Sequence, residues 1–137
     1  NEQAGALGEA CAKAIGDSGK RVVLISSHSL SHRHFVTESP LPEDMSREHI
    51  YNHSQYVWDM KLVDLMREGK MREVIGIMPE FTEQTMAETE GGGLTWMMAA
   101  MGHPDYPAEI YGYQSVIGTG NLIAAWDPDS ASREIVL

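Results

Sequence analysis

The sequence predicts an α/β fold, in which a layered sheet is flanked by helices, for a single domain portion spanning residues 1–137. Three observations support this class. An amphipathic helical pattern is followed by a short apolar run of the kind found in buried strands. Helical apolar spacing continues through the middle of the chain, and alternating residues around a glycine-rich turn follow near its end. Helical and strand patterns mixed in this way are typical of layered α/β domains.

The first two elements are expected to be a helix and a buried strand. Residues 2–15 place Leu7, Cys11 and Ile15 at intervals of four, which predicts one face of an amphipathic helix. The Gly-Asp-Ser-Gly sequence that follows is expected to end this helix. Residues 21–26 then form a branched apolar run, which predicts a strand buried on both faces and ending near the loop that follows.

A second amphipathic helix is expected over roughly Ser54–Gly69. Trp58, Leu62 and Leu65 recur at helical spacing, and charged residues such as Asp59 occupy the positions between them. This pattern predicts that the charged residues face solvent. Gly69 is expected to stop the helix.

A third helical segment is expected directly afterwards, over residues 71–78. Its apolar residues are Met71, Val74, Ile75 and Met78, and they repeat the helical spacing. Pro79 is expected to end the segment, because proline lacks a backbone N–H and cannot continue a helix. The nine methionines of the chain are interpreted as adaptable core residues and not as metal ligands.

The last third of the chain predicts a buried helix and a pair of strands. Residues 93–101 are apolar nearly all round, which indicates a helix enclosed by the core. Residues 109–117 alternate and favour a strand. The glycine-rich residues 118–121 are expected to turn the chain, and residues 122–126 to return beside the first strand.

Composition excludes several classes of function. Acidic residues outnumber basic ones by 20 to 10, for a formal net charge of −10. Nucleic acids and anionic membrane surfaces both need clustered Lys and Arg, so neither is expected as a partner. Cys11 is the only cysteine, which excludes an intrachain disulfide and a multi-cysteine zinc site. With no apolar run long enough to span a membrane and no signal-peptide pattern, the expected location is cytoplasmic.

Three histidines lie within seven residues after the apolar run, namely His28, His32 and His34. Loops that follow strands deliver reactive side chains in α/β enzymes, and histidine exchanges protons near neutral pH. These residues therefore form a candidate site, although a set of satisfied polar groups is the alternative. Their spacing does not match a zinc-protease helix. The serines around them lack the Gly-x-Ser-x-Gly pattern of a hydrolase nucleophile.

A second unusual segment places acidic residues before three consecutive glycines, residues 91–93. A phosphate cradle is disfavoured, because no Lys-Ser or Lys-Thr follows the glycines and the preceding carboxylates repel anions. The glycines more readily provide backbone freedom that lets Glu88 or Glu90 turn inward. The two segments together indicate an acid/base histidine and a carboxylate metal ligand in one site. A metal site needs two or three firm ligands, and the chain offers one or two.

These segments resemble a known family. Residues 21–33, with Leu-Ser-His at 30–32 as their centre, resemble the strand-to-loop motif of the type III extradiol ring-cleaving dioxygenases, the superfamily of protocatechuate 4,5-dioxygenase. Residues 88–93 and 117–120 resemble the C-terminal half of the same family. The resemblance covers nearly the whole chain, and it is strongest to the catalytic subunits of the aminophenol-cleaving members.

The resemblance implies a function and a role for each candidate residue. It implies a non-haem Fe(II) centre held by two histidines and a glutamate, with Glu88 as the glutamate and His32 as a separate acid/base group. The two iron-binding histidines are expected in an N-terminal half that this chain lacks, so the chain is expected to be the C-terminal part of a larger catalytic subunit. His28 and His34 would bind or position the substrate. The implied reaction opens the ring of a 2-aminophenol with dioxygen to give 2-aminomuconic semialdehyde.

Other interpretations stay open at this point. The resemblance also implies a hetero-oligomer with a related, non-catalytic subunit, and the chain could be that structural subunit instead. The presence of both His32 and Glu88 argues against this alternative. A hydrolytic zinc enzyme is a third possibility. Within the dioxygenase interpretation, catechol-type and protocatechuate-type compounds are rival substrates.

Overall fold

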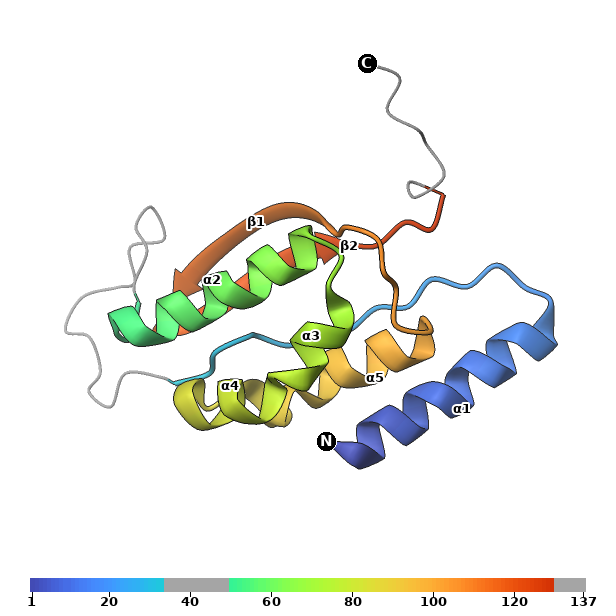
Figure 1. Cartoon of the computed structure of the whole chain (residues 1–137), viewed down its shortest axis with the longest axis horizontal. Helices are drawn as coiled ribbons and strands as arrows, with labels where there is room; N and C mark the ends of the chain where they lie inside the picture. Colours follow the sequence, from blue (N-terminus) through green and yellow to red (C-terminus); the bar gives the residue numbers. More distant parts are fainter. Residues whose placement is uncertain (34–49, 130–137) are drawn as a thin grey trace, which may run out of the picture.

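The computed structural model describes residues 1–33 and 50–129, and Figure 1 shows their arrangement. The elements, in chain order, are α1 (Glu2–Ser18), α2 (His53–Arg67), α3 (Met71–Gly76), α4 (Met78–Thr85), the 3₁₀ turn η1 (Glu88–Gly91), α5 (Gly92–Ala100), β1 (Glu109–Val116) and β2 (Thr119–Ala125). The two strands form an antiparallel sheet, and α2 lies along it. Helices and a sheet are thus combined, as the predicted α/β class requires.

The hairpin of β1 and β2 confirms the strand pair expected around the glycine-rich turn. Its register pairs Glu109 with Ala125 at the open end and Val116 with Thr119 beside the turn. Ile117 and Gly118 make the turn, with φ values of 52° and 82°. Two residues with positive φ suit the right-handed twist of the flanking strands, which explains the tight connection.

The helices expected from periodicity are present with small shifts at their ends. α1 ends at Gly19, whose φ of 62° makes the left-handed turn that glycine adopts without strain. α2 begins after Asn52, whose side chain accepts a hydrogen bond from the backbone N–H of Gln55. α5 is largely buried, as its uniformly apolar sequence predicts.

The prediction that Pro79 closes a helix is wrong. Two short helices occupy this region, and Pro79 lies in the first turn of the second one, α4. A proline is well tolerated there, because the first backbone N–H groups of a helix have no partner within it. The apolar spacing over residues 71–78 therefore runs across a break at Ile77 between α3 and α4.

The prediction of a buried strand over residues 21–26 is also wrong. The segment has no regular secondary structure, and Val23 and Ile25 are 84% and 81% exposed. A strand buried on both faces needs neighbouring strands and covering helices. Within residues 1–33 and 50–129, the sheet consists of β1 and β2, which pair with each other and leave this segment outside the ladder. A buried strand here would need neighbouring strands, and the described residues provide none that pairs with residues 21–26.

The core lies between α2, α3, α4 and α5, with the hairpin closing one side. Its fully buried large side chains include Leu62, Met66, Met71, Phe81 and Met98. Met66, Met71, Met78 and Met98 are buried, as expected of core residues, whereas Met86 is 56% exposed and Met45 lies outside the described residues. By contrast, α1 packs on α5 and contributes only Gly8 to the buried set. Within the residues described, no helix is long and apolar enough to cross a membrane.

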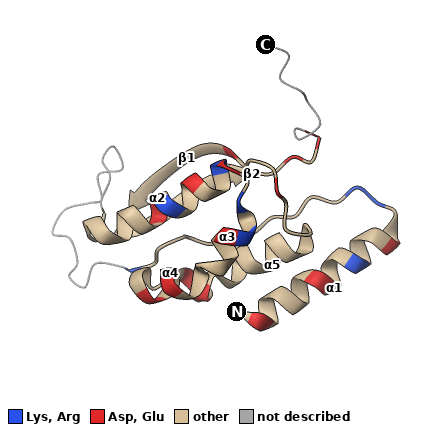
Figure 2. Ribbon diagram, in the orientation of Figure 1, with Lys and Arg blue, Asp and Glu red and all other residues tan. Residues whose placement is uncertain are grey.

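Charged residues are dispersed over this framework. Figure 2 shows basic residues on α1, α2 and α3 and in the connecting loops, including the adjacent pair Lys20 and Arg21 after α1. Arg67 pairs with Asp64, and Lys70 pairs with Glu68, both on the surface.

Candidate active site

The loop that carries His32 is attached on one side to the hairpin. The backbone N–H of Leu30 donates to the carbonyl of Gly120 at 2.8 Å, and the N–H of Gly120 donates back to the carbonyl of Ser31 at 3.0 Å. His32 also forms a bridge with Thr119 at the start of β2. The loop thus behaves as a short extra strand beside the hairpin, which fixes its direction.

The other side of the loop is attached to the end of α4 and to η1. The N–H of His32 donates to the carbonyl of Thr85 at 3.3 Å, and the N–H of Glu88 donates to the carbonyl of Leu30 at 3.3 Å. Because the backbone is held from both sides, the His32 and Glu88 side chains start from fixed positions on neighbouring segments.

The glycine-rich turn directs Glu88 inward and Glu90 outward. Thr89, Glu90 and Gly91 all have left-handed backbone conformations, with φ values of 49°, 55° and 70°. Gly91 takes this conformation without strain, and its missing side chain leaves the space that Met78 occupies. Glu88 reaches the histidine loop as a result, whereas Glu90 is exposed. The sequence left the choice between these two carboxylates open.

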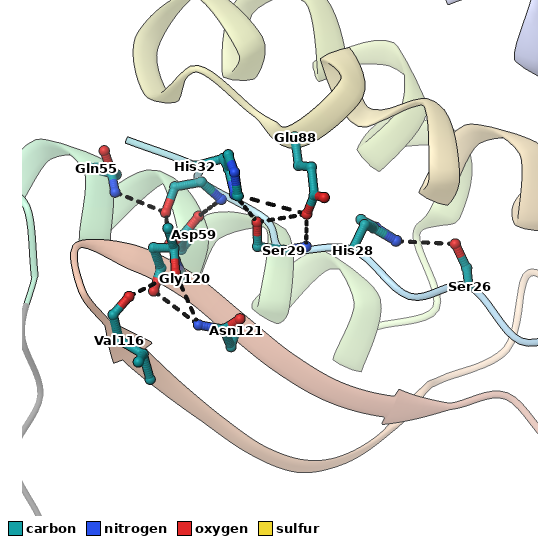
Figure 3. Close-up of polar contacts among 12 residues, drawn as sticks. Ser26, His28, Ser29, His32, Gln55, Asp59, Glu88, Val116, Gly120 and Asn121 are labelled. Carbon is teal, nitrogen blue, oxygen red and sulfur yellow. Dashed lines mark hydrogen bonds and ion pairs between the residues drawn. The ribbon is translucent and has the colours of Figure 1, made fainter. Parts of the chain in front are cut away.

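Glu88, Ser29 and His32 form one hydrogen-bonded cluster (Figure 3). One Glu88 oxygen, Oε2, accepts the backbone N–H of Ser29 at 2.5 Å and the Ser29 hydroxyl at 2.9 Å. The Ser29 hydroxyl oxygen lies 2.6 Å from Nδ1 of His32, and the same Nδ1 lies 3.8 Å from Glu88 Oε2. The His32 and Glu88 side chains are 36% and 33% exposed, so both are reachable from outside.

These contacts favour the ionised form of Glu88. The hydrogen bond from the Ser29 backbone N–H is the main reason that the pKa of this carboxyl is lowered. The Ser29 hydroxyl and the nearby His32 and His28 act in the same direction, while partial burial opposes them. Glu88 is therefore an anionic oxygen donor at neutral pH, which is the form that binds a metal cation.

The same contacts orient the His32 ring. A hydroxyl group has one hydrogen to donate, and the Ser29 hydroxyl gives it to the Glu88 carboxylate, which can only accept. Ser29 then accepts from His32 Nδ1, which places the ring proton of a neutral imidazole on Nδ1. In that tautomer Nε2 carries the basic lone pair.

His28 lies on the same loop but has a different neighbour. Its Nδ1 is 3.0 Å from the hydroxyl of Ser26, and its ring packs against Gly93 at the start of α5, where a Cβ atom would lie within 2.9 Å of it. Burial lowers the pKa of His28, and the Glu88 carboxylate partly offsets that effect. His28 therefore supports the loop against α5, within the electrostatic field of Glu88.

The remaining candidate residue, His34, lies outside the described residues. Among residues 1–33 and 50–129, no group of three or more His, Cys, Asp or Glu side chains is arranged to hold a metal ion. Glu88 is the one carboxylate brought to the histidine loop by the turn.

Sequence reasoning did not assign the two serines of the loop or Asp59. Ser29 faces Glu88, whereas Ser31 faces Asp59 on α2. In a regular strand these two side chains would share one face, and the bend of the chain at Leu30 and Ser31 separates them. Asp59 was expected on the charged face of its helix, but it is 0% exposed. A signal for its burial existed, because Gln55, Asp59 and Val63 follow one another at intervals of four and form one buried stripe.

Ser29→Ala is expected to raise the pKa of Glu88. The variant loses the hydroxyl contact but keeps the stronger backbone one, so the rise is partial. A lowered carboxyl pKa stabilises the fold above the unfolded-state value of roughly 4.3, and this contribution is lost as the pH falls through the folded-state pKa. In Ser29→Ala the contribution is smaller, and its loss is complete at a higher pH, because the folded-state pKa lies closer to the unfolded-state value. Carbon-13 NMR titration of Glu88 in the metal-free protein measures the change.

Ser27→Ala provides the control for this titration, because Ser27 is exposed and lies two residues away on the same segment. We expect it to leave the Glu88 titration unchanged. An identical Glu88 midpoint in Ser29→Ala and the unaltered protein would show that the hydroxyl contact does not act on the carboxylate.

Comparison with known proteins adds independent information. Residues 1–124 match the family described as the catalytic LigB subunit of aromatic ring-opening dioxygenase. The chain is similar to the 2-aminophenol 1,6-dioxygenase beta subunit of Pseudomonas sp., with 50% identity over 121 residues, which cover 88% of this chain and 40% of that protein. It is also similar to 3,4-dihydroxyphenylacetate 2,3-dioxygenase of Escherichia coli, with 28% identity over 105 residues, covering 77% of this chain and 37% of that protein. The chain thus spans about 40% of the length of the curated relatives that it matches.

Proposed function

Because the chain belongs to the LigB family of aromatic ring-opening dioxygenases, we propose that it forms part of a catalytic subunit that opens the ring of 2-aminophenol-type substrates with dioxygen. The product would be 2-aminomuconic semialdehyde. The observation that carries this proposal is the cluster of Glu88, Ser29 and His32. It places an anionic carboxylate beside an oriented histidine, at the two positions that the family resemblance assigns to a metal ligand and an acid/base group.

Fe(II) is the proposed cofactor, with Glu88 as one of its ligands. The donor chemistry fits, since two imidazoles and one carboxylate are the common ligand set of non-haem Fe(II) oxygenases. Glu88 is ionised, held by Ser29 and one-third exposed, so it can offer an oxygen to a cation. The two histidine ligands are proposed to lie outside residues 1–137. When bound, the iron would supply the electronic link between the aromatic ring and dioxygen.

His32 is proposed as the acid/base group and not as a ligand. Since Ser29 engages Nδ1, proton exchange with the substrate is assigned to Nε2. His32 would accept the proton of the substrate hydroxyl as the substrate binds and return a proton as the ring opens. Ser29 and Glu88 would hold the ring in the same tautomer through both steps, because the hydrogen bonds at Nδ1 do not depend on the substrate.

The other two histidines of the loop are proposed to support substrate binding. His28 is held by Ser26 and packs against α5, so its contribution would be to shape the wall of the site next to Glu88. His34 follows His32 by two residues in the sequence and is proposed to contact the substrate.

A hetero-oligomer is also proposed, because the relative with 50% identity is named as a beta subunit. The partner would be a related subunit without catalytic groups. The alternative, in which this chain is the structural subunit, is disfavoured by the intact cluster of His32, Ser29 and Glu88. The second relative acts on a dihydroxylated ring, by its name, so a catechol-type substrate is the competing choice.

A substrate comparison tests the proposal. The complete enzyme, loaded with Fe(II) without air, is given 2-aminophenol or catechol in ¹⁸O₂-saturated buffer, and oxygen uptake and product mass are measured. We expect both atoms of one dioxygen molecule in a ring-opened product, and a higher kcat/KM for 2-aminophenol. Preference for catechol would overturn the substrate assignment. Absence of oxygen uptake with either compound would overturn the proposed activity.

A further inference from the structure

A buried carboxylate contacts the histidine loop at Ser31, two residues after the contact of Glu88 with Ser29. Asp59 of α2 is 0% exposed. Its Oδ1 accepts the backbone N–H of Ser31 at 3.1 Å, and its Oδ2 accepts the Ser31 hydroxyl at 2.6 Å. The hydroxyl of Tyr113 on β1 donates to the same Oδ2 at 2.6 Å. Asp59 therefore joins α2, the hairpin and the loop at one point.

The hydroxyl of Ser31 is fully engaged in this network. Its oxygen accepts the side-chain N–H of Gln55 and the backbone N–H of Gly120, each at 3.0 Å. A hydroxyl has one donor and two acceptor positions, so its hydrogen is left for Asp59. This arrangement fixes the rotation of the Ser31 side chain, and the backbone contact to Asp59 fixes the peptide that precedes it.

The hairpin is shaped to admit this carboxylate. A Cβ atom at Gly120 would collide with Oδ2 of Asp59 and would lie 2.8 Å from the Ser31 hydroxyl oxygen. Glycine at this position therefore permits the close approach of three segments. Burial raises the pKa of Asp59, and the hydrogen bonds from Ser31 and Tyr113 oppose this rise. Since the Ser31 hydrogen is directed to Asp59, the carboxyl group acts as an acceptor at that contact.

We propose that Asp59 is a positioning residue for His32, acting through Ser31. Ser31 immediately precedes His32, and the loop, which bends at Leu30 and Ser31, sends Ser31 toward Asp59 while Ser29 and His32 meet Glu88. With Ser31 held by both its backbone and its side chain, the Cα of His32 has one location. The ring of His32 then points toward Glu88 from a fixed base. This inference rests on the proposed function, which makes His32 the acid/base group. It adds Asp59 as the residue that holds His32 in position.

A positioning role and ordinary structural support can be distinguished by their effects on kcat and on the dependence of kcat on His32. The hydrogen bonds of Asp59 go to Ser31 and Tyr113, so its loss acts first on the loop and the hairpin and removes no group assigned to metal or substrate binding. Its loss frees the peptide next to His32, and a small displacement of a reacting group lowers the rate of the chemical step. The effect should therefore appear in kcat and depend on the presence of the His32 ring.

The test is a double-mutant cycle on the complete Fe(II)-loaded enzyme with 2-aminophenol. Asp59→Asn keeps the size of the side chain but presents N–H groups to the Ser31 and Tyr113 hydroxyls. We expect kcat to fall about 10–100-fold and KM to change by less than about threefold. Asp64→Asn is the matched control, because Asp64 is on the same helix, is 65% exposed and pairs with Arg67 on the surface. This control should keep its kcat.

The second half of the cycle separates positioning from folding. In a His32→Ala background, Asp59→Asn should lower the residual kcat by less than about twofold, because the group that it positions is gone. An equal loss in both backgrounds would overturn the proposal, and so would a fully active Asp59→Asn enzyme. If Asp59→Asn does not fold, Tyr113→Phe removes one hydrogen bond to the same oxygen. It should show a smaller loss with the same dependence on His32.

An NMR measurement makes the outcome independent of catalysis. In the metal-free protein, Asp59→Asn should shift or broaden the ring signals of His32 and leave those of His53, an exposed residue of the same helix, unchanged. Unaltered His32 signals would overturn the proposal even in an active enzyme. If the unaltered enzyme lacks ring-opening activity, the proposed function fails, while this measurement still decides whether Asp59 acts on His32.

Discussion

Glu88→Gln is expected to remove iron from the complete enzyme and abolish ring opening. Glutamine keeps the shape of the side chain but removes the negative charge that Ser29 stabilises. Loss of a residue that merely supports a ligand weakens metal binding about 10–100-fold, and loss of the ligand should cost at least as much. Iron per subunit, measured by elemental analysis after gel filtration, reports the effect directly.

Glu90→Gln is the matched control for this experiment. Glu90 lies two residues away in the same turn, but it is exposed and directed outward. We expect this variant to retain both iron and activity. If Glu88→Gln instead keeps stoichiometric iron and full turnover, the ligand is another group and the assignment of Glu88 is wrong.

His32→Ala is expected to retain iron and lose turnover by roughly 10²–10⁴-fold, the range for a missing general acid/base. Iron should be retained because the proposal assigns metal binding to Glu88 and proton transfer to His32. Glu88 is the proposed metal ligand, while His32 is held by Ser29 in the tautomer that leaves its basic lone pair on Nε2. Iron content and kcat should be measured on the same purified sample, because the two results together distinguish a proton carrier from a ligand.

Variants of two other histidines, His53 and His34, serve as comparisons for His32→Ala. His53→Ala alters an exposed residue at the start of α2 and should leave iron and kcat unchanged. His34→Ala should have a milder effect than His32→Ala on turnover and none on iron. A metal-free His32→Ala enzyme would identify His32 as a ligand, and a fully active one would remove it from the mechanism.

The parts of the fold that were predictable are those determined by nearby residues. The spacing of Leu7, Cys11 and Ile15 and the stop at Gly19 are local signals, and α1 follows them. The hairpin likewise depends on its turn residues. The run over residues 21–26 depends on neighbours that its own residues do not specify, and its apolar side chains are accordingly exposed. The sequence of this run shows that it is apolar, but it does not show which other segments would cover it.

The candidate site shows the same division. Family resemblance singled out Glu88 and His32, and the structure brings them within 3.8 Å of each other at Oε2 and Nδ1. The role of Ser29 between them was not predictable, because a serine hydroxyl can hydrogen-bond to many kinds of neighbour and the sequence does not show which one lies beside it. The burial of Asp59 depends on Tyr113, which is 54 residues away. Periodicity along α2 could suggest a buried stripe, but it could not identify the partner.

The double attachment of the histidine loop has a consequence for how the site forms during folding. Ser29 and Glu88 are 59 residues apart in the sequence, and Ser31 and Gly120 are 89 apart. Closing chain segments of this length costs entropy before any of these hydrogen bonds can form, so the cluster has no stable local precursor. It assembles only when α2, η1 and the hairpin have come together. The amide hydrogen of His32 should therefore exchange with solvent only through a large, cooperative opening of the molecule, and the reactive geometry exists only in the folded ensemble.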